Sequence, residues 1–256
     1  GDDILSKAGY NTDFNMNEQV VTIDKMLVSS TFIPNIQELK NHFDVRGQYS
    51  KELGIALAQR FDRAVMKTLA AGGKDSSTPS GQPRGIDLDG DLSTGPKVVQ
   101  TITKLAQSLD ENDVPDDGTR FIILDPLTYY KLVGEDNIAI NRDYDGSGSI
   151  STGKVPVVAG VNVYKSNNFD AINVTSQPDS DDANANNNPF GGTDGYNADL
   201  NETIALGGHP SGVATVKLLD LATESDYSVA HQGTLFVAKY AMGHNVIRPG
   251  ACVNIK

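Results

Sequence analysis

The most regular pattern of hydrophobic and polar positions in the chain runs from Ser50 to Ala71 and predicts one long helix. Because each step of four residues overshoots one turn by roughly 40°, its apolar stripe winds around the axis, and more than one neighbouring element must cover it. We expect Gly72 and Gly73 to end the helix and Lys67 to lie on its surface. The apolar positions recur at four-residue steps, at Tyr49, Leu53, Leu57, Phe61, Val65 and Leu69.

The chain ahead of this helix predicts an extended arm followed by a short helix. Val20 to Val28 is a β-prone run interrupted by Asp24 and Lys25, and it would expose a flat face if left alone. Ile33 to Phe43 has the spacing of a short amphipathic helix, with Pro34 near its start. We therefore expect the arm to need a partner.

The middle of the chain predicts a small unit of helices and strands. Arg120 to Leu124 (RFIIL) indicates a buried strand, after which Asp125 and Pro126 begin a helix. Small and apolar residues alternate from Gly153 to Phe169, which predicts a hairpin with its turn at Ala159 and Gly160. A further helix is predicted from Lys97 to Leu109, with one face made of Val98, Ile102, Leu105 and Leu109.

Two polar segments separate these units. Lys74 to Pro96 is rich in Pro, Gly, Ser and Asp and predicts a linker or surface loop. Asp170 to Glu202 carries acidic residues with too little apolar area to offset the cost of ordering a core, so we expect a solvated acidic loop, centred on residues 175 to 200.

The C-terminal part of the chain predicts long antiparallel strands. Strands this long would leave open edges unless they lie against the long helix or a neighbouring chain. The strand-like runs are Ile204 to Leu206, Val213 to Leu221 and Gly233 to Met242, followed by Val246 to Pro249 and Ala251 to Ile255.

Composition and charge exclude several classes of protein. The 256 residues, 38% of them hydrophobic, can bury a substantial core, but no run approaches the roughly 18 apolar residues of a membrane helix, so we predict no membrane partner. A net charge of -12 argues against a protein that neutralises nucleic-acid phosphates. The single cysteine, Cys252, excludes an internal disulfide and fits a reducing cytoplasm. Because the sequence does not begin with Met, we expect a further segment ahead of Gly1.

One segment has part of the pattern of a calcium loop. Asp143, Asp145 and Ser147 stand at its first, third and fifth positions, and oxygens at alternate positions suit a cation with about six to eight oxygen ligands. The twelfth position, which should supply a bidentate carboxylate, is Lys154. A plain turn is therefore favoured over a metal site, and the same judgement covers the DLDGDL segment, with Asp87, Asp89 and Asp91.

The sequence also contains no recognisable catalytic or cofactor motif. Neither a zinc-binding pair of histidines, a nucleophile elbow, a phosphate loop nor a dinucleotide fingerprint is present. Gly207, Gly208 and His209 resemble an oxyanion loop only faintly, and a turn is the favoured interpretation. We therefore predict no catalytic residue and no cofactor. The four histidines are scattered, at His42, His209, His231 and His244.

The order of these parts resembles the major capsid protein of tailed phages, which has the Hong Kong 97-type fold, in particular that of short-tailed podoviruses related to coliphage T-seven and the cyanophages. The final stretch and the long-helix stretch are the most specific. The similar stretches are VVTIDKMLVSS, HFDVRGQYSKELGIALAQRFDRAVM, TRFIILDPLTYYKLV, GSGSISTGKVPVVAGVNVYKSNNF and GVATVKLLDLATESDYSVAHQGTLFVAKYAMGHNVIRPGACV.

The resemblance implies an α+β fold in four parts. Residues 1–34 would be an extended loop (E-loop) arm lying over a neighbouring subunit, and residues 35–96 a peripheral domain with the spine helix at 50–71. Residues 97–203 would be the axial domain with the acidic loop 175–200, and residues 204–256 would supply return strands of the peripheral domain and a long β-hinge. The acidic loop departs from the family's pattern and is expected to be an insertion.

The resemblance also implies a structural protein without enzymatic activity. It would assemble in the host cytoplasm as hexamers and pentamers into the icosahedral virion capsid, with a scaffolding protein and a portal as partners. Packaged double-stranded DNA would be close to it only non-specifically. Two alternatives stay open at this point: an encapsulin-like shell protein, and a calcium-dependent binding or adhesion module built on the two acidic segments.

Overall fold

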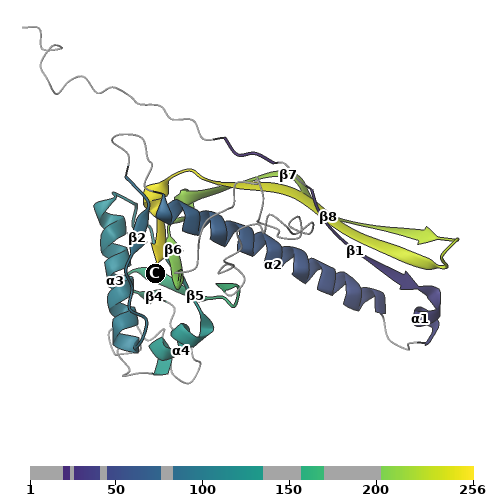
Figure 1. Ribbon diagram of the computed structural model, residues 1–256, viewed down its shortest axis with the longest axis horizontal. Coiled ribbons are helices and arrows are strands. Elements are labelled where there is room, and N and C mark those ends of the chain that lie inside the picture. The colour runs from purple at the N-terminus through teal and green to yellow at the C-terminus, as the bar shows by residue number, and fades with distance from the viewer. Residues whose placement is uncertain (1–19, 24–25, 41–44, 76–82, 135–156, 170–202) are drawn as a thin grey trace, which may run out of the picture.

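The structure is a computed structural model that describes residues 20–23, 26–40, 45–75, 83–134, 157–169 and 203–256. Figure 1 shows a long molecule, with a compact body at one end from which a ribbon of strands and one long helix extend side by side. The described elements are β1 (Leu27–Pro34), α1 (Asn35–Lys40), α2 (Val45–Lys74), β2 (Ile86–Leu88), α3 (Gly95–Glu111), β3 (Phe121–Leu124), α4 (Pro126–Gly134), β4 (Val157–Val158), β5 (Val161–Lys165), β6 (Ala205–Gly208), the 3-10 turn η3 (Pro210–Gly212), β7 (Val213–Ser228), β8 (Gly233–Val246), the 3-10 turn η4 (Pro249–Ala251) and β9 (Cys252–Ile255).

The body is built on a mixed sheet whose strand order is β2-β9-β6-β3-β5-β4. Helices α3 and α4 cover one face, where the buried Ile122 and Leu124 of β3 meet the apolar face of α3. The predicted helix face is confirmed, because Val98, Ile102, Leu105 and Leu109 are all fully buried. The predicted hairpin is also confirmed, with β4 and β5 joined at Ala159 and Gly160, which both have positive φ.

The C-terminal half of α2 covers the other face of this sheet. Met66, Leu69 and Ala70 pack against Leu206 of β6 and Cys252 of β9. Further toward its N-terminus, α2 leaves the body and packs along the ribbon, where Leu57 meets Ala238 and Tyr240 of β8. The prediction that more than one element must cover the winding apolar stripe is therefore confirmed.

Two predictions about this helix are wrong. Gly72 and Gly73 do not end α2 but lie inside it, since the helix continues to Lys74. They are glycines because neighbours press on them: a Cβ added at Gly73 would lie 2.5 Å from the backbone N of Asn254 in β9. Lys67 is buried rather than on the surface, because α2 is enclosed on all sides where it enters the body. Burial and the charge of Arg60 lower the pKa of Lys67.

The ribbon is a sheet of strand order β1-β8-β7, with both pairs antiparallel. The predicted strands at β7 and β8 are confirmed, but Ile204 to Leu206 lies in the body, as part of β6. Ile33 was expected in a helix and instead lies in β1, where it is buried, so that helix α1 begins only at Asn35. The β-prone sequence before it thus continues as a strand that pairs within its own chain.

The segment expected to be a linker, Lys74 to Pro96, also contains a strand. Ile86–Leu88 forms β2, which runs parallel to β9 and extends the body's sheet. The sheet therefore combines strands from before, within and after the middle unit of the chain. None of the helices in the described part of the chain is long and apolar enough to cross a membrane.

Candidate assembly interface

An apolar groove opens between the middle of α2 and strand β7. Within the ribbon, helix α2 packs mainly against β8 and β1, so the side of β7 that faces it is only partly covered. The floor of the groove is formed by its most buried residues, Leu57 and Tyr240, where the hydroxyl of Tyr240 donates to the carbonyl oxygen of Leu57 at 3.5 Å. The groove has a volume of about 250 Å³ and is lined by Gly54, Leu57, Ala58, Phe61, Asp62, Lys217, Leu221, Tyr240 and Met242.

The rim of this groove carries one charge of each sign. Burial raises the pKa of Asp62 on α2. On β7, Nζ of Lys217 lies 3.5 Å from Oδ1 of Asp220. The backbone N–H of Leu221 and then Lys217 lower the pKa of Asp220. The interior of the groove is apolar, and the charges on its rim nearly cancel. The groove therefore suits an apolar protein segment rather than a phosphate or a metal ion.

Strand β7 forms one edge of the ribbon, because in the described part of the chain β8 alone pairs with it. Its register is interrupted between Lys217 and Leu219 and again between Leu219 and Ala222. Such bulges hinder continuous pairing of a new strand along an edge. Leu218 and Leu221 are 75% and 53% exposed in this stretch, so a partner can contact their side chains without extending the sheet.

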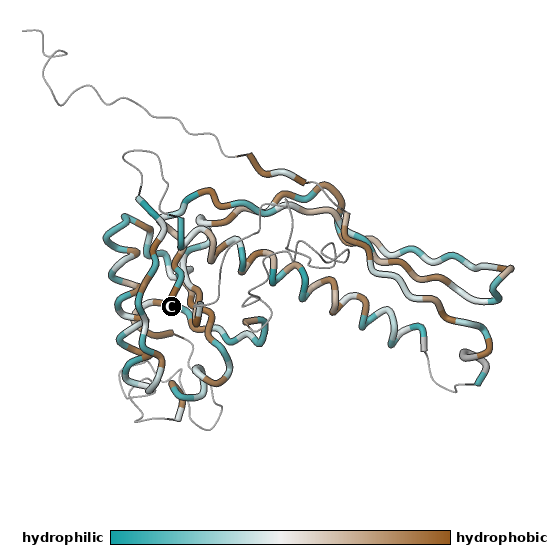
Figure 2. The backbone as a smooth tube through the Cα atoms, viewed as in Figure 1, coloured by the Kyte–Doolittle hydropathy of each residue, from teal (hydrophilic) through white to brown (hydrophobic). Residues whose placement is uncertain are grey.

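The face of the ribbon away from α2 also carries exposed apolar side chains. Phe32 of β1 pairs with Leu235 of β8, and they are 41% and 38% exposed. Val28 on the same face of β1 is 50% exposed, whereas Ile33, on the opposite face, is buried. Figure 2 shows hydrophobic positions running the length of this thin ribbon, far from the body's core. Both faces thus present apolar area that a single chain leaves in contact with water.

The acidic segments considered as calcium sites do not come together around one point in the described residues. Asp87 binds Nδ2 of Asn254 at 2.7 Å and Nζ of Lys256 at 3.0 Å. Asp91 lies 2.6 Å from Nζ of Lys97 instead. Within residues 83–134 and the other described ranges, no group of three or more His, Cys, Asp or Glu side chains is placed to hold a metal ion. Asp143, Asp145 and Ser147 lie outside the described residues.

The histidines that the structure describes lie on separate elements. His231, at the tip of the ribbon, is 3.0 Å from Oγ of Ser228. His244 lies under α2, 2.9 Å from Oγ1 of Thr215 and edge-on to the ring of Phe61, and burial lowers its pKa. His42 lies outside the described residues.

The Gly207, Gly208 and His209 segment, with its faint likeness to an oxyanion loop, forms the end of β6 and the turn that follows it. Gly208 has φ of 151°, and a side chain there would meet the carbonyl oxygen of Ala251. The two glycines are therefore explained by close packing between β6 and its neighbours.

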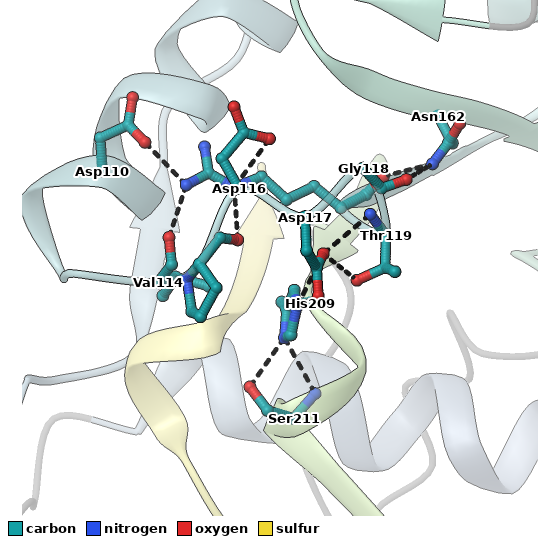
Figure 3. A network of polar contacts seen from close by, with 11 residues as sticks. Asp110, Val114, Asp116, Asp117, Gly118, Thr119, Asn162, His209 and Ser211 are labelled. Atoms are coloured by element: carbon teal, nitrogen blue, oxygen red, sulfur yellow. Dashed lines mark hydrogen bonds and ion pairs between the residues drawn. The ribbon is translucent and has the colours of Figure 1, made fainter.

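Sequence reasoning missed a polar contact at the junction of body and ribbon (Figure 3). His209 reaches Asp117, 92 residues away, with Nε2 lying 3.3 Å from both carboxylate oxygens. Its Nδ1 lies 2.8 Å from Oγ of Ser211 and accepts the backbone N–H of Ser211 at 3.2 Å. Serine, histidine and aspartate also make up hydrolase triads, but here the ring caps the turn η3. No spacing in the sequence could have indicated this contact.

The loop that carries Asp117 is fixed by Arg120, which is 3% exposed. Its guanidinium donates to the carbonyl oxygens of Val114 and Pro115 at 2.5 and 3.1 Å and to Oδ1 of Asp110 at 2.7 Å. The hydroxyl and backbone N–H of Thr119 are the main cause that lowers the pKa of Asp117 to about 2, and His209 adds to it. The carboxylate that faces His209 is therefore ionised at neutral pH.

The whole chain, residues 1–256, matches the family model described as "Gp10A-like: Major capsid protein". The chain belongs to this family. Among relatives of this capsid protein is the major capsid protein of Escherichia phage T7, 28% identical over 255 residues, a match that covers 93% of this chain and 73% of the relative. The major capsid protein of Enterobacteria phage T3 is 29% identical over 256 residues, with the same coverage.

Solved capsid structures share the fold of this capsid protein. The capsid of cyanophage P-SCSP1u gives a TM-score of 0.72 at 29% identity and covers 98% of this chain and 79% of its own. The mature capsid of bacteriophage PhiM1 gives 0.65 at 14% identity, with 98% and 78% covered, which shows the fold alone. The predicted resemblance is confirmed: this is a tailed-phage major capsid protein with the α+β, Hong Kong 97-type fold, and it forms an icosahedral shell.

Proposed function

We propose that this capsid protein assembles as hexamers and pentamers in which the groove between α2 and β7 is covered by the arm of a neighbouring subunit. The observation that carries the proposal is the apolar groove beside a bulged edge strand, with Leu221 half exposed on its wall. Burying the exposed half of such a side chain against a partner contributes about 1 kcal/mol, and a closed shell repeats the contact at every subunit.

The described end of the arm supports this occupant. Val20 and Met26 are 63% and 53% exposed, so these apolar side chains are left available to another chain. Nδ2 of Asn245 donates to the carbonyl oxygen of Val20 at 2.8 Å, and β1 pairs with β8. The arm is therefore attached to the ribbon of its own chain. In this proposal residues 1–34 are the arm, anchored by Val20 and β1, and the part ahead of Val20, which lies outside the described residues, extends to the neighbour.

The remaining roles follow the family resemblance. Residues 35–96 form the peripheral domain around the spine helix, residues 97–203 the axial domain at the centre of each capsomer, and residues 204–256 the return strands and β-hinge. A scaffolding protein and a portal are partners during assembly in the host cytoplasm. The net charge of -12 supports a wall that DNA approaches without specific binding, and the role is structural, without catalysis or cofactor.

Electron microscopy of matched variants tests the groove contact. Leu221→Asp places a charge on the groove wall, whereas Ser225→Asp places the same charge on the same strand outside the lining residues. We expect Leu221→Asp to prevent closed shells at a protein concentration where the wild type and Ser225→Asp form them. Unfolding in urea on the unassembled chains should show that both variants stay folded. Closed shells of folded Leu221→Asp, in wild-type yield, would overturn the proposal.

A further inference from the structure

Besides helix α2, which runs along both parts, two turns carry the described chain across between body and ribbon. Turn η3 links β6 to β7, and turn η4 links β8 to β9. The crossings lie side by side, since the backbone N–H of His209 donates to the carbonyl oxygen of Ala251 at 2.9 Å. Helix α2 packs against β6 and β9 of the body and against β8 of the ribbon, so it also helps to hold the two parts together.

The first crossing is attached to the loop between α3 and β3, residues 112–119, which we call the junction loop. His209 makes this attachment through Nε2, 3.3 Å from the carboxylate of Asp117, while its Nδ1 holds the N–H of Ser211 in η3. The ring must therefore carry its proton on Nε2 to serve both partners. The side chain of His209 is 9% exposed, whereas that of Asp117 is 51% exposed, so their contact is enclosed on the histidine side and open to water on the carboxylate side.

The second crossing is attached to the same loop by a different side chain. Nη2 of Arg248, at the start of η4, donates to the carbonyl oxygens of Asn112 and Asp113, both at 3.0 Å. In the opposite direction, Nδ2 of Asn112 donates to the carbonyl oxygen of Gly250 at 3.1 Å. Both crossings thus meet one short loop, which joins the end of α3 to the start of β3.

The junction loop is rigid enough to act as an anchor. Arg120 binds the carbonyl oxygens of Val114 and Pro115 from within the body. Asp117 accepts both the hydroxyl and the backbone N–H of Thr119, at 2.6 and 3.0 Å. A buried cation with several acceptors restrains its neighbours far more than a surface ion pair does.

We infer that the junction loop fixes the angle between ribbon and body, with His209 and Arg248 as positioning residues for the two crossings. Because the two attachments hold separate crossings, together they oppose a rotation of the ribbon relative to the body that either attachment alone would allow. The inference concerns a single subunit, so it stands or fails independently of the groove contact between subunits.

Distances between spin labels on one chain test this inference. Labels at Ser225→Cys on the ribbon and Lys104→Cys on α3 report the angle, and native Cys252 is buried and escapes labelling. Labelled chains are diluted into an excess of unlabelled chains, so that distances within one chain dominate in assembled and unassembled samples alike. We expect a narrow distribution for the otherwise wild-type chain.

Variants remove the attachments one at a time. His209→Ala and Asp117→Ala break the first attachment from its two ends, and Arg248→Ala breaks the second. We expect each to widen the distance distribution, and His209→Ala combined with Arg248→Ala to widen it at least about twofold. Asp116→Ala is the matched control, because Asp116 lies in the same loop but faces Arg120, at 4.0 Å.

A purely stabilising role predicts a different result. In that case the variants would lower the urea midpoint of unfolding while the folded chains kept the wild-type distance distribution, and this outcome would overturn the inference. Widening by Asp116→Ala to the same extent would also overturn it, since the effect would then come from general loosening of the loop.

Discussion

Two glycines of the same helix should respond in opposite ways to replacement by alanine. Gly54 and Gly73 both lie inside α2, so either substitution gains about 1 kcal/mol of helix propensity. Among the described residues, a Cβ at Gly54 would meet nothing within 4 Å. At Gly73 it would lie 2.5 Å from the backbone N and 2.9 Å from the Cβ of Asn254, and 3.0 Å from the carbonyl carbon of Val253.

The size of the effect at Gly73 follows from which atoms are in the way. Those atoms belong largely to β9, a strand held between β2 and β6 in the body's sheet, so they cannot rotate aside as the end of a side chain can. Overpacking of this kind costs typically 1–3 kcal/mol, and backbone contact places it near or above the upper end. After the gain in propensity, we expect Gly73→Ala to lower the free energy of unfolding by about 2 kcal/mol, and Gly54→Ala to raise it by about 1 kcal/mol.

Urea unfolding of the unassembled chain, followed by circular dichroism, measures both values under conditions where assembly does not contribute. If the free energy of unfolding falls with urea concentration at the same slope in both variants, their unfolding midpoints can be compared directly. The difference between the variants, about 3 kcal/mol, is the contact cost freed of the shared propensity gain. Equal stability of Gly73→Ala and Gly54→Ala would refute the packing of α2 against β9 described above.

Three further predictions rest on buried groups. Arg120→Ala should lower the free energy of unfolding by about 3 kcal/mol, because the carbonyl oxygens of Val114 and Pro115 lose their charged donor; urea unfolding checks this, and a loss under 1 kcal/mol would contradict it. Burial lowers the pKa of His244, so below about pH 6.5 the unfolded chain binds its proton more readily and stability falls; His244→Gln should flatten that slope between pH 6.5 and 5, and an unchanged slope would show that His244 does not contribute. Burial raises the pKa of Cys252 to about 12, so a thiol reagent at pH 8 should label it only after unfolding, and rapid labelling of the folded chain would be evidence against this burial.

Local patterns were enough to predict much of this fold. The spacing of three and four residues in α3, the Asp125 and Pro126 start of α4 and the Ala159 and Gly160 turn are set by neighbours in sequence, and the structure has all three. Asp125 caps α4 as expected, with Oδ2 accepting the N–H of Leu127 at 3.1 Å. The resemblance to capsid proteins depended on longer stretches and is confirmed by the family match.

The predictions that failed depend on contacts between distant segments. Gly72 and Gly73 look like a helix end in sequence, and only the approach of β9 explains why they continue a helix. Lys67 has helix spacing suited to a surface, but α2 is enclosed there by the body. Strand β2 is only three residues long and is defined by pairing with β9, so its own sequence carries little signal.

The sequence indicated that the ribbon must be covered, but it did not indicate which of its surfaces forms the groove. Long strands with open edges indicated that the ribbon must lie against the long helix or a neighbouring chain. The groove itself depends on which strands α2 leaves uncovered and on bulges beside Leu219, and neither appears as a sequence pattern. The same holds for His209 and Asp117, which only the crossing of two elements brings together.

The central claim is that each subunit's groove is completed by a neighbouring copy, and a cryo-electron microscopy map of the assembled shell tests it most directly. The account predicts side-chain density from the arm of an adjacent subunit in contact with Leu221 and Phe61. A closed shell whose groove is empty, or filled by residues of the same chain, would contradict it.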